Sequence, residues 1–388
     1  MDTPMTVAVI GAGTMGSGIA QVAAQAGHPV ILFDTRHDAV DKALAGLRRT
    51  LDKLVEKGRL TGDQANGIHG RITPASDLKD LAGSGLVIEA IIEDLGVKKK
   101  LFAELEGTVA TDAILATNTS SLSVTAIAAA CSRPERVIGL HFFNPAPLLP
   151  LVEVVPGLAT DAALATRMMA LMQAWGKTPV VCKDTPGFIV NRVARPFYGE
   201  AIRIYEEGIA DMPTIDAAMK SAGFKMGPFE LMDLIGNDIN FTVTRTVWEA
   251  FFYDPRYKPS FTQQRQVESG RLGRKSGRGY YRYEQGQEQG QGQVASTPVR
   301  ESIVERILSM LINEAADALF WQVASAQDID LAMTKGVNYP KGLLAWADEQ
   351  GAAHWLGVLE RLQATYGEDR YRPSPLLRRA AATSGRLV

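Results

Sequence analysis

Three glycines near the start of the chain have the spacing of a phosphate-binding loop. Gly11-Ala12-Gly13-Thr14-Met15-Gly16 directly follows an apolar run that begins at Thr6, and it opens a helical pattern. In such a loop the first glycine permits a tight turn, the second lets a pyrophosphate approach the backbone, and the third lets helix and strand pack closely. The sequence therefore predicts a dinucleotide site built on residues 11 to 16.

Asp34 ends the next strand candidate, PVILFD. A carboxylate there would accept hydrogen bonds from the adenosine ribose and repel a 2′-phosphate, which favours NAD over NADP. Arg36, two residues on, is the one feature that would suit a 2′-phosphate. The alternative interpretation of the whole unit is a purely structural turn.

His141 and Glu153 are the candidate acid–base pair. His141, one of five histidines, lies near the end of the strand candidate RVIGLHFF, and Glu153 lies in the next one, LVEVV. A neutral imidazole can accept a proton near neutral pH, and a carboxylate can orient it and stabilise the imidazolium. Each residue alone has a plainer interpretation: a buried structural histidine and a strand-edge charge.

The elements that must position these residues alternate in type. Seven strand candidates, the first at Thr6 and the last ending at Lys183, are separated by helical patterns. This alternation predicts an α/β Rossmann-type doubly wound sheet. Residues 38 to 70 are too long for one crossover helix and are broken at Gly58 and Gly62, so we expect an inserted helical hairpin.

After the DTPG turn at 184 to 187 the sequence changes to amphipathic helical patterns, which continue to about Tyr283. Residues 284 to 293 are a Gln/Gly segment typical of a linker. Beyond it, Ile189-Val190-Asn191-Arg192 returns as Ile303-Val304-Glu305-Arg306, and further identities recur at an offset of 114 without a gap. We therefore predict two tandem all-α domains, with chance similarity between amphipathic regions as the alternative. The expected boundaries are 1–184, 185–283, 284–297 for the linker and 298–388.

Composition excludes several classes of protein. The formal net charge of -2 gives no basic field for nucleic acid. Cys131 and Cys182 have no spacing for a disulfide framework or a zinc site, so we expect no metal. No apolar run approaches membrane-spanning length and no leader precedes the first strand, which favours a soluble, cytoplasmic protein.

Several ordered motifs carry a resemblance to a known family. They are TNTSSL from Thr117, GLHFFNP from Gly139, LVEVVPG from Leu151, DTPGFIVNR from Asp184, AIIED with Lys98 downstream, MGPFEL from Met226 and LGRKSGRGYY from Leu272. From Val7 to Tyr283 the chain resembles the L-3-hydroxyacyl-CoA dehydrogenase family. The resemblance implies an oxidoreductase that reversibly oxidises (3S)-3-hydroxyacyl-CoA to 3-oxoacyl-CoA with NAD.

The resemblance also implies roles for single residues. His141 is the base, Glu153 orients it, and Ser120 and Asn191 hydrogen-bond the acyl group. Asn191 lies in the first helix of the helical region, which implies an interdomain cleft. Ser120 or the neighbouring Ser121 could instead cap the helix that follows.

Further matches to the family imply a set of residues near the cofactor: Glu93, Lys98, Asn118, Ser120, Asn144 and Lys275. For coenzyme A, a polyanion, Arg49, Lys53 and Lys57 form a basic stripe at i, i+4 and i+8. Thr50 and Lys57 match coenzyme-binding positions of the family. A solvated helix face is the alternative for the stripe.

The second copy departs from the pattern, because Glu305 stands where Asn191 stands in the first. We expect it to be a degenerate packing partner that uses apolar helix faces. Single-copy members dimerise through this domain, so either a monomer with an internal pseudo-dimer or a homodimer is implied.

Two other functions stay open at the sequence level. One is a dehydrogenase of a non-CoA hydroxy or sugar acid, like gulonate dehydrogenase. The other is a non-catalytic NAD-binding protein, which should lack part of the set Ser120, His141, Glu153 and Asn191, and all four are present. The acyl group is also open, from short fatty acyl to dicarboxylic 3-hydroxyadipyl, as is a fatty-acid (β-oxidation) or aromatic (phenylacetate) catabolic setting.

Overall fold

The computed structural model describes residues 5–283, 296–383 and 385–388, so the predicted linker segment 284–293 lies outside the described residues. The chain divides into two compact units, Met1–Phe188 and Ile189–Val388. The division falls four residues after the boundary expected from the DTPG turn.

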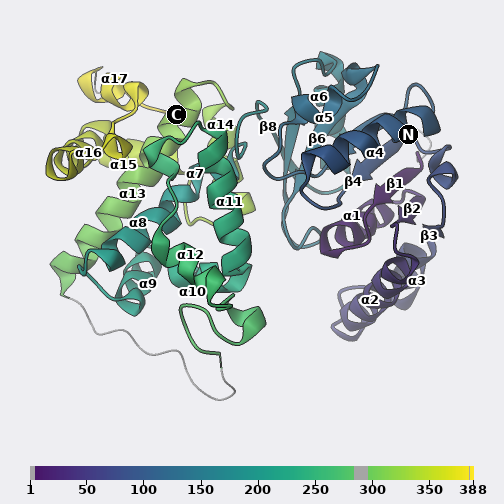
Figure 1. The fold of residues 1–388 in the computed structure, drawn as a ribbon, viewed down its shortest axis with the longest axis horizontal. Helices are drawn as coiled ribbons and strands as arrows, with labels where there is room; N and C mark the ends of the chain where they lie inside the picture. The colour runs from purple at the N-terminus through teal and green to yellow at the C-terminus, as the bar shows by residue number, and fades with distance from the viewer. Residues whose placement is uncertain (1–4, 284–295, 384) are drawn as a thin grey trace. The chain divides into compact units, whose positions relative to one another are not determined.

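The first unit is built on one eight-stranded sheet of order β3-β2-β1-β4-β5-β6-β7-β8 (Figure 1). Its neighbours are parallel except β6 and β7, which run antiparallel. The strands are β1 (Val7–Ile10), β2 (Val30–Phe33), β3 (Ile72–Ala75), β4 (Leu86–Glu89), β5 (Ile114–Thr117), β6 (Val137–Phe142), β7 (Leu151–Pro156) and β8 (Thr178–Val181). The α/β prediction is confirmed, and all seven strand candidates are strands.

Helices cover both faces of the sheet, as the period of two along each strand requires. Val7 and Val9 face a core shared with α1 (Thr14–Gln25), α2 (His37–Glu56), α3 (Gly62–Gly70) and α6 (Ala162–Ala174). Ala8 and Ile10 face the opposite core, with α4 (Leu95–Thr108) and α5 (Val124–Ala128). The sheet is therefore doubly wound.

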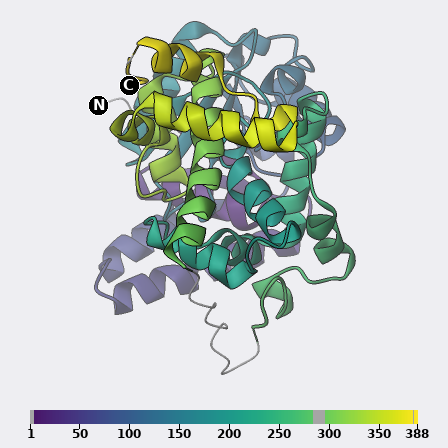
Figure 2. The same ribbon diagram turned by 90° about the vertical axis from the view of Figure 1, so that its left-hand side faces the viewer.

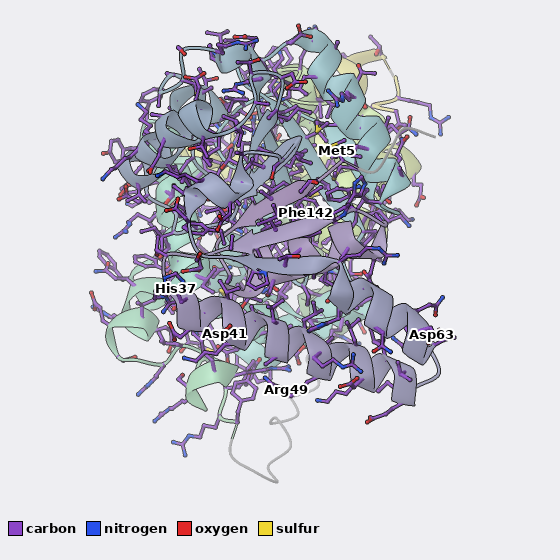
Figure 3. All side chains as sticks on the ribbon, turned by 90° about the vertical axis from the view of Figure 1, so that its right-hand side faces the viewer. Met5, His37, Asp41, Arg49, Asp63 and Phe142 are labelled. Carbon is purple, nitrogen blue, oxygen red and sulfur yellow. The ribbon has the colours of Figure 1, made fainter. Side chains whose placement is uncertain are left out.

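Helices α2 and α3 form the predicted inserted hairpin. The turn between them ends at Thr61, whose side chain accepts from the Gln64 backbone N–H while the Gln64 side chain accepts from the Thr61 N–H. This reciprocal cap fixes where α3 begins. Figure 3 shows His37 at one end of the hairpin and Asp63 near the other, with Arg49 on α2 between them.

The second unit consists of two series of helices (Figure 2). The first is α7 (Val190–Val193), α8 (Arg195–Glu206), α9 (Met212–Ser221), α10 (Pro228–Ile235), α11 (Asn237–Ala250), the short turn η3 (Pro255–Tyr257) and α12 (Phe261–Glu268). The second is α13 (Thr297–Phe320), α14 (Ala326–Gly336), α15 (Leu343–Gln350), α16 (Ala352–Tyr366), the turn η5 (Asp369–Tyr371) and α17 (Pro375–Thr383). Corresponding helices occur in the same order in both series, as expected for a duplicated domain.

The register between the series is not constant, which corrects the gapless offset expected from the sequence. Helices α9 and α14 begin 114 residues apart, and so do η3 and η5. Between them, α10 with α15 and α11 with α16 begin 115 residues apart. The second series thus has one extra residue before α15 and one fewer after α16. Both changes fall in connections, where an added residue disturbs no packed helix.

The series also differ where they begin. Helix α13 is continuous for 24 residues, whereas its counterpart is split into α7 and α8 around Ala194. Pro196 lies in the first turn of α8, where its missing N–H needs no partner. The aligned residue in α13 is Met310, which lets that helix continue. The split ends the short helix that carries Asn191.

The two series pack through α13, which contacts α8 and α9. Arg192 Nε lies 2.5 Å from Glu314 Oε1, and Arg306 Nε lies 3.0 Å from Glu200 Oε2. Because the two arginines occupy equivalent positions, as the two glutamates do, the contact is self-complementary like that of a twofold dimer. Both carboxylates are buried. The expected packing through apolar faces therefore has a buried ionic centre.

Among the described residues, no helix is long and apolar enough to cross a membrane.

Candidate active site

His141 and Glu153 face each other across β6 and β7, whose antiparallel register pairs them directly. His141 Nδ1 lies 2.6 Å from Glu153 Oε2; the histidine side chain is 7% exposed and the glutamate is fully buried. A carboxylate at Nδ1 favours the tautomer that carries its proton there. The lone pair on Nε2 is then available to accept a proton.

The Glu93 carboxylate accepts several hydrogen bonds from the loop that follows β5. Its Oε1 accepts from the Thr119 hydroxyl at 2.6 Å, from the backbone N–H groups of Ser120 and Ser121 at 2.9 and 3.1 Å, and from the Ser120 hydroxyl at 3.3 Å. The Ser120 side chain is thereby positioned by one carboxylate. The predicted cofactor residue Glu93 and the predicted substrate residue Ser120 belong to the same contact.

Lys98 is buried beside Glu93 and joins it to a second carboxylate. Its ammonium lies 2.5 Å from Glu89 Oε1 and 3.4 Å from Glu93 Oε2. Burial alone would raise the pKa of Glu93, but the Lys98 charge and the hydroxyl and amide donors outweigh it and hold that pKa below its ordinary value. Glu93 therefore stays ionised, and the buried Lys98 ammonium fixes its position relative to Glu89.

The capping alternative for Ser120 and Ser121 is wrong. Helix α5 begins after Ser123, whose hydroxyl accepts from the Ala126 backbone N–H at 3.1 Å. Ser123 also donates to Asp184 at 2.8 Å. Since Ser123 caps the helix, Ser120 is not needed for that purpose.

The glycine loop has the geometry expected of a pyrophosphate cradle. A Cβ on Gly11, whose φ is +100°, would lie 2.5 Å from the Ala90 carbonyl oxygen, and one on Gly16 would lie 1.7 Å from the Gly11 carbonyl oxygen. A Cβ on Gly13 would meet nothing within 4 Å. The outer glycines are required by the fold, whereas the middle one leaves open space at the N-terminus of α1, where an anion is stabilised.

Asp34 is tied to that loop. One of its carboxylate oxygens accepts from the Ala12 N–H at 2.8 Å and the other from the Arg36 N–H at 2.9 Å. A cavity of about 250 Å³ beside Asp34 is lined mainly by apolar side chains, among them Phe33, Leu78, Ile91, Val97 and Leu101. An apolar slot next to an acid suits an adenine ring and its ribose. The residues present therefore fit NAD.

A larger cavity of about 800 Å³ extends from the glycine loop along α2. Three of the residues expected to bind coenzyme A, namely Thr50, Lys53 and Lys57, line this cavity, whereas Arg49 does not. Positions at i, i+4 and i+8 rotate progressively around a helix of 3.6 residues per turn. The positions that line the cavity, Gly46, Thr50, Lys53 and Lys57, alternate steps of four and three and so stay on one face of the helix. Three further cations line the cavity that the sequence did not assign to coenzyme A, namely Arg36, Lys42 and Arg59.

The remaining predicted residues have varied settings. Asn118 accepts through its side-chain oxygen from the Phe142 N–H at 2.8 Å, which ties the end of β5 to β6. Asn144 is exposed in the connection between β6 and β7. In the second unit, Asn191 lies on α7 and the Lys275 ammonium lies 2.6 Å from Asp238.

A glycine loop at a helix N-terminus, an acid at the end of the second strand and a buried histidine–glutamate pair on the same sheet define an NAD-dependent dehydrogenase. Residues 6–185 match the family model described as "3-hydroxyacyl-CoA dehydrogenase, NAD binding domain". Residues 187–283 and again 303–386 match "3-hydroxyacyl-CoA dehydrogenase, C-terminal domain". The chain belongs to the 3-hydroxyacyl-CoA dehydrogenase family and is an oxidoreductase that uses NAD.

Similar proteins agree with this assignment. The chain is 43% identical to a 3-hydroxyadipyl-CoA dehydrogenase of Escherichia coli, with 98% of each chain covered. A crystal structure of 3-hydroxybutyryl-CoA dehydrogenase from the same species matches 98% of this chain and 99% of its own at a TM-score of 0.92 and 42% identity. A probable 3-hydroxybutyryl-CoA dehydrogenase of Deinococcus radiodurans is 43% identical over 72% of this chain and all of its own. The names differ in the acyl group.

Proposed function

We propose that this chain reversibly oxidises the 3-hydroxyl group of a (3S)-3-hydroxyacyl-CoA to a ketone, giving a 3-oxoacyl-CoA. The observation that carries the proposal is the buried pair His141 and Glu153, with 2.6 Å between Nδ1 and Oε2. This pair supplies a base whose second nitrogen is available to a substrate hydroxyl.

The steps assigned to the chain are proton transfers and hydrogen bonds. His141 Nε2 removes the hydroxyl proton, so that the C–O bond becomes a double bond while the hydrogen on C3 departs with its electron pair. NAD, when bound, supplies the nicotinamide carbon that accepts this hydride. Glu153 stabilises the imidazolium that results, because an opposite charge held at hydrogen-bonding distance favours the protonated ring. In the reverse direction the imidazolium returns the proton to the oxygen.

Ser120 and Asn191 are proposed to hydrogen-bond the acyl group. The Ser120 hydroxyl lies 3.3 Å from Glu93 Oε1, and the same oxygen accepts from the Ser120 backbone N–H. The rotation of the Ser120 side chain is therefore restricted before a substrate binds. Asn191 follows the start of α7 and precedes the break at Ala194. An amide there can donate to a carbonyl oxygen.

The cofactor is proposed to contact the glycine loop with Thr14 and Met15, the Asp34 carboxylate, and the residues matched to the family: Glu93, Lys98, Asn118, Ser120, Asn144 and Lys275. Lys98 is buried and ion-paired, so its contribution acts through Glu93. The coenzyme A phosphates are proposed to bind in the 800 Å³ cavity beside Lys53 and Lys57. Its several cations favour a polyanionic thioester over a free hydroxy acid or sugar acid, which carries a single carboxylate.

A steady-state screen tests this function. We would measure NADH formation with 3-hydroxybutyryl, 3-hydroxyoctanoyl and 3-hydroxyadipyl thioesters of coenzyme A, with the corresponding free acids and L-gulonate as controls. Turnover of at least one thioester with (3S) stereochemistry, and none of the free acids, is expected. Turnover of free acids alone would instead assign the enzyme to the sugar-acid or hydroxy-acid dehydrogenases.

A further inference from the structure

A second sizeable cavity, of about 680 Å³, lies entirely within the helical unit, between α8, α11 and α12. Five arginines line it: Arg195, Arg203, Arg245, Arg256 and Arg370. Four of them pair with carboxylates, which are Glu368 for Arg203, Glu249 for Arg245, Asp317 for Arg256 and Glu200 for Arg370. In the described part of the chain, Arg195 has no such partner.

Arg195 is nevertheless 7% exposed. Its Nε donates to the Asn191 carbonyl oxygen at 2.8 Å, one Nη donates to the Thr244 hydroxyl at 3.2 Å, and the guanidinium lies 5.0 Å from the centre of the Tyr198 ring. All these contacts are neutral. A buried cation without a counter-ion is costly to retain unless an anion completes it.

The side chains that support Arg195 are polar but uncharged, so they fix its position without neutralising its charge. The Thr244 hydroxyl donates to the Asn240 carbonyl oxygen at 2.9 Å, and Gln263 Nε2 donates to Asn240 Oδ1 at 2.6 Å. Asn240 and Gln263 are buried. This small polar cluster fixes the guanidinium while only two of its five N–H donors are used.

The degenerate copy has none of this cluster. The residues aligned with Arg195, Asn240, Thr244 and Gln263 are Ser309, Trp355, Leu359 and Leu377, all buried. By contrast, Arg192, Glu200, Arg256 and Tyr257 keep their identity as Arg306, Glu314, Arg370 and Tyr371. These residues, identical in both series, form the ionic contact between them. The Arg195 cluster takes no part in that contact, and of the two series it occurs in the one that carries Asn191.

The cavity also suits an amphipathic ligand. Ile202, Phe241 and Trp248 supply apolar wall, and the Trp248 indole N–H has no hydrogen-bond partner among the described residues. Arg195 follows Asn191 by four residues, and its Nε donates to the Asn191 carbonyl oxygen across the break at Ala194, so the two residues are neighbours. A short acyl chain with a terminal carboxylate has an oxygen at C3 and an anion a few bonds further on.

We infer that Arg195 binds the distal carboxylate of a dicarboxylic 3-hydroxyacyl-CoA, with Asn191 on the acyl oxygen. The inference rests on the proposed function and adds the substrate class. A guanidinium offers two parallel N–H donors that match a carboxylate, and the burial of Arg195 strengthens the contact. A monocarboxylic chain of the same length would place a methyl group against the buried charge, and so would bind less well.

The test compares two thioesters that differ only at the chain end, 3-hydroxyadipyl-CoA and 3-hydroxyhexanoyl-CoA. With the wild-type chain, kcat/KM should favour the dicarboxylic substrate by about 10- to 100-fold, the range expected for a charged hydrogen bond. Arg195→Leu should remove this preference, with little change for 3-hydroxyhexanoyl-CoA. Arg195→Lys should recover part of it, because the charge returns without the planar pair of donors.

Arg265→Leu is the matched control, since Arg265 is an exposed cation on α12 that does not line the cavity. It should keep the wild-type preference. Thermal unfolding of Arg195→Leu should occur at the wild-type temperature or above, because an unpaired buried charge has been removed. A lower unfolding temperature together with equal losses on both thioesters would assign Arg195 a structural role and overturn the inference.

Other outcomes distinguish a failure of the carboxylate site from a failure of the dehydrogenase function. If the wild-type chain oxidises both thioesters equally, the carboxylate site is wrong and the dehydrogenase function stands. If it oxidises neither, the proposed function itself fails. If Arg195→Leu raises KM equally for both, but not for their truncated pantetheine analogues, the guanidinium binds a coenzyme A phosphate, which also overturns the inference.

Discussion

His141 Nδ1 lies 2.6 Å from Glu153 Oε2, at paired positions of two antiparallel strands, with neither side chain appreciably exposed. Because backbone hydrogen bonds fix the register of β6 and β7, the imidazole is oriented by the sheet itself rather than by a loop. A proton acceptor on such a rigid element can be placed accurately toward a substrate.

This relationship predicts the effect of removing the base. His141→Gln should lower kcat by roughly 10²–10⁴-fold, the usual contribution of a general base, and leave NAD binding nearly intact. Steady-state kinetics and a fluorescence titration with NADH measure the two quantities. Turnover close to that of the wild type would remove His141 as the base.

Glu153→Gln is its companion variant. The amide no longer stabilises an imidazolium and can present its NH₂ group to Nδ1, which would favour the wrong tautomer. We expect a kcat loss of the order of 10²–10⁴-fold, with KM for the thioester changed much less. A pure KM effect would contradict the orienting role.

How far the sequence predicts the fold depends on where each element lies in the sheet. β1, β4 and β5 are fully buried, and their unbroken apolar runs are easy to recognise. β3 was missed because Thr73 and Pro74 are exposed and Pro74 has no N–H to donate. β3 pairs with β2 and lies at the edge of the sheet, where a proline is tolerated.

The candidate site was predictable where its chemistry is local or carried by a family motif. The glycine loop and Asp34 follow one strand each, and His141 and Glu153 were placed through their motifs. The gathering of Ser120 by Glu93 spans 27 residues, and the Arg192–Glu314 contact spans 122. No periodicity in a single sequence connects such positions, because they meet only once the fold has formed.

Asp34→Ala is expected to relax the preference for NAD. The variant removes the repulsion of a 2′-phosphate and leaves Arg36, whose Nε lies 3.9 Å from Asp34, free to meet that phosphate. The ratio of kcat/KM for NAD to that for NADP should fall by at least about 10-fold. Equal values for the two cofactors in the wild-type chain would contradict the role of Asp34.

The basic cavity predicts a selective effect on the coenzyme A portion of the substrate. Replacing Lys53 and Lys57 with glutamine should raise KM for the full thioester by about 10-fold and barely change KM for a pantetheine thioester. Added salt should weaken the difference. Arg49→Gln is the control, because Arg49 is exposed on the same helix but does not line the cavity. Identical losses for both substrates would reduce the stripe to a solvated face.

Lys177 predicts a pH dependence of stability. Its ammonium donates to the carbonyl oxygens of Ala146 and Leu149, and burial lowers its pKa from 10.5 to about 8. Between those two values the unfolded chain holds a proton that the folded chain has released. The contribution of Lys177 to the free energy of unfolding therefore rises as the pH increases from about 8 toward 10.5.

The measurement is denaturant unfolding of the wild-type chain and of Lys177→Met at several pH values. The difference in free energy of unfolding, wild type minus variant, should increase by less than about 1.4 kcal/mol per pH unit above pH 8, since Lys177 is only partly buried. Below pH 7 it should be flat. A difference that falls with rising pH has the wrong sign and would reject the assignment.

Two buried carboxylates, Glu314 and Glu200, join the two series of helices. Glu314 accepts from Arg192, Arg256 and Tyr257, and Glu200 accepts from the equivalent Arg306, Arg370 and Tyr371. Glu314→Gln would leave two buried guanidinium groups without their shared charge, which costs about 3–5 kcal/mol. Glu200→Gln should cost a similar amount. Glu305→Gln, at a partly exposed site near Arg361 and His354, should cost little and serves as the control.

Removing Pro298 to Val388 tests the whole contact between the two series, because it deletes nearly all of the second one. The deletion takes away α13, exposes the face of α8 that packs against it, and leaves Glu200 and Arg192 without their partners. Because the lost surface is self-complementary, a truncated chain can restore it by pairing with a second truncated chain. We therefore expect a dimer or an aggregating protein, and we expect the full chain to bind one NAD and one substrate. A truncated chain that remains a stable, fully active monomer, or calorimetric titration that shows two substrate sites in the full chain, would defeat this account.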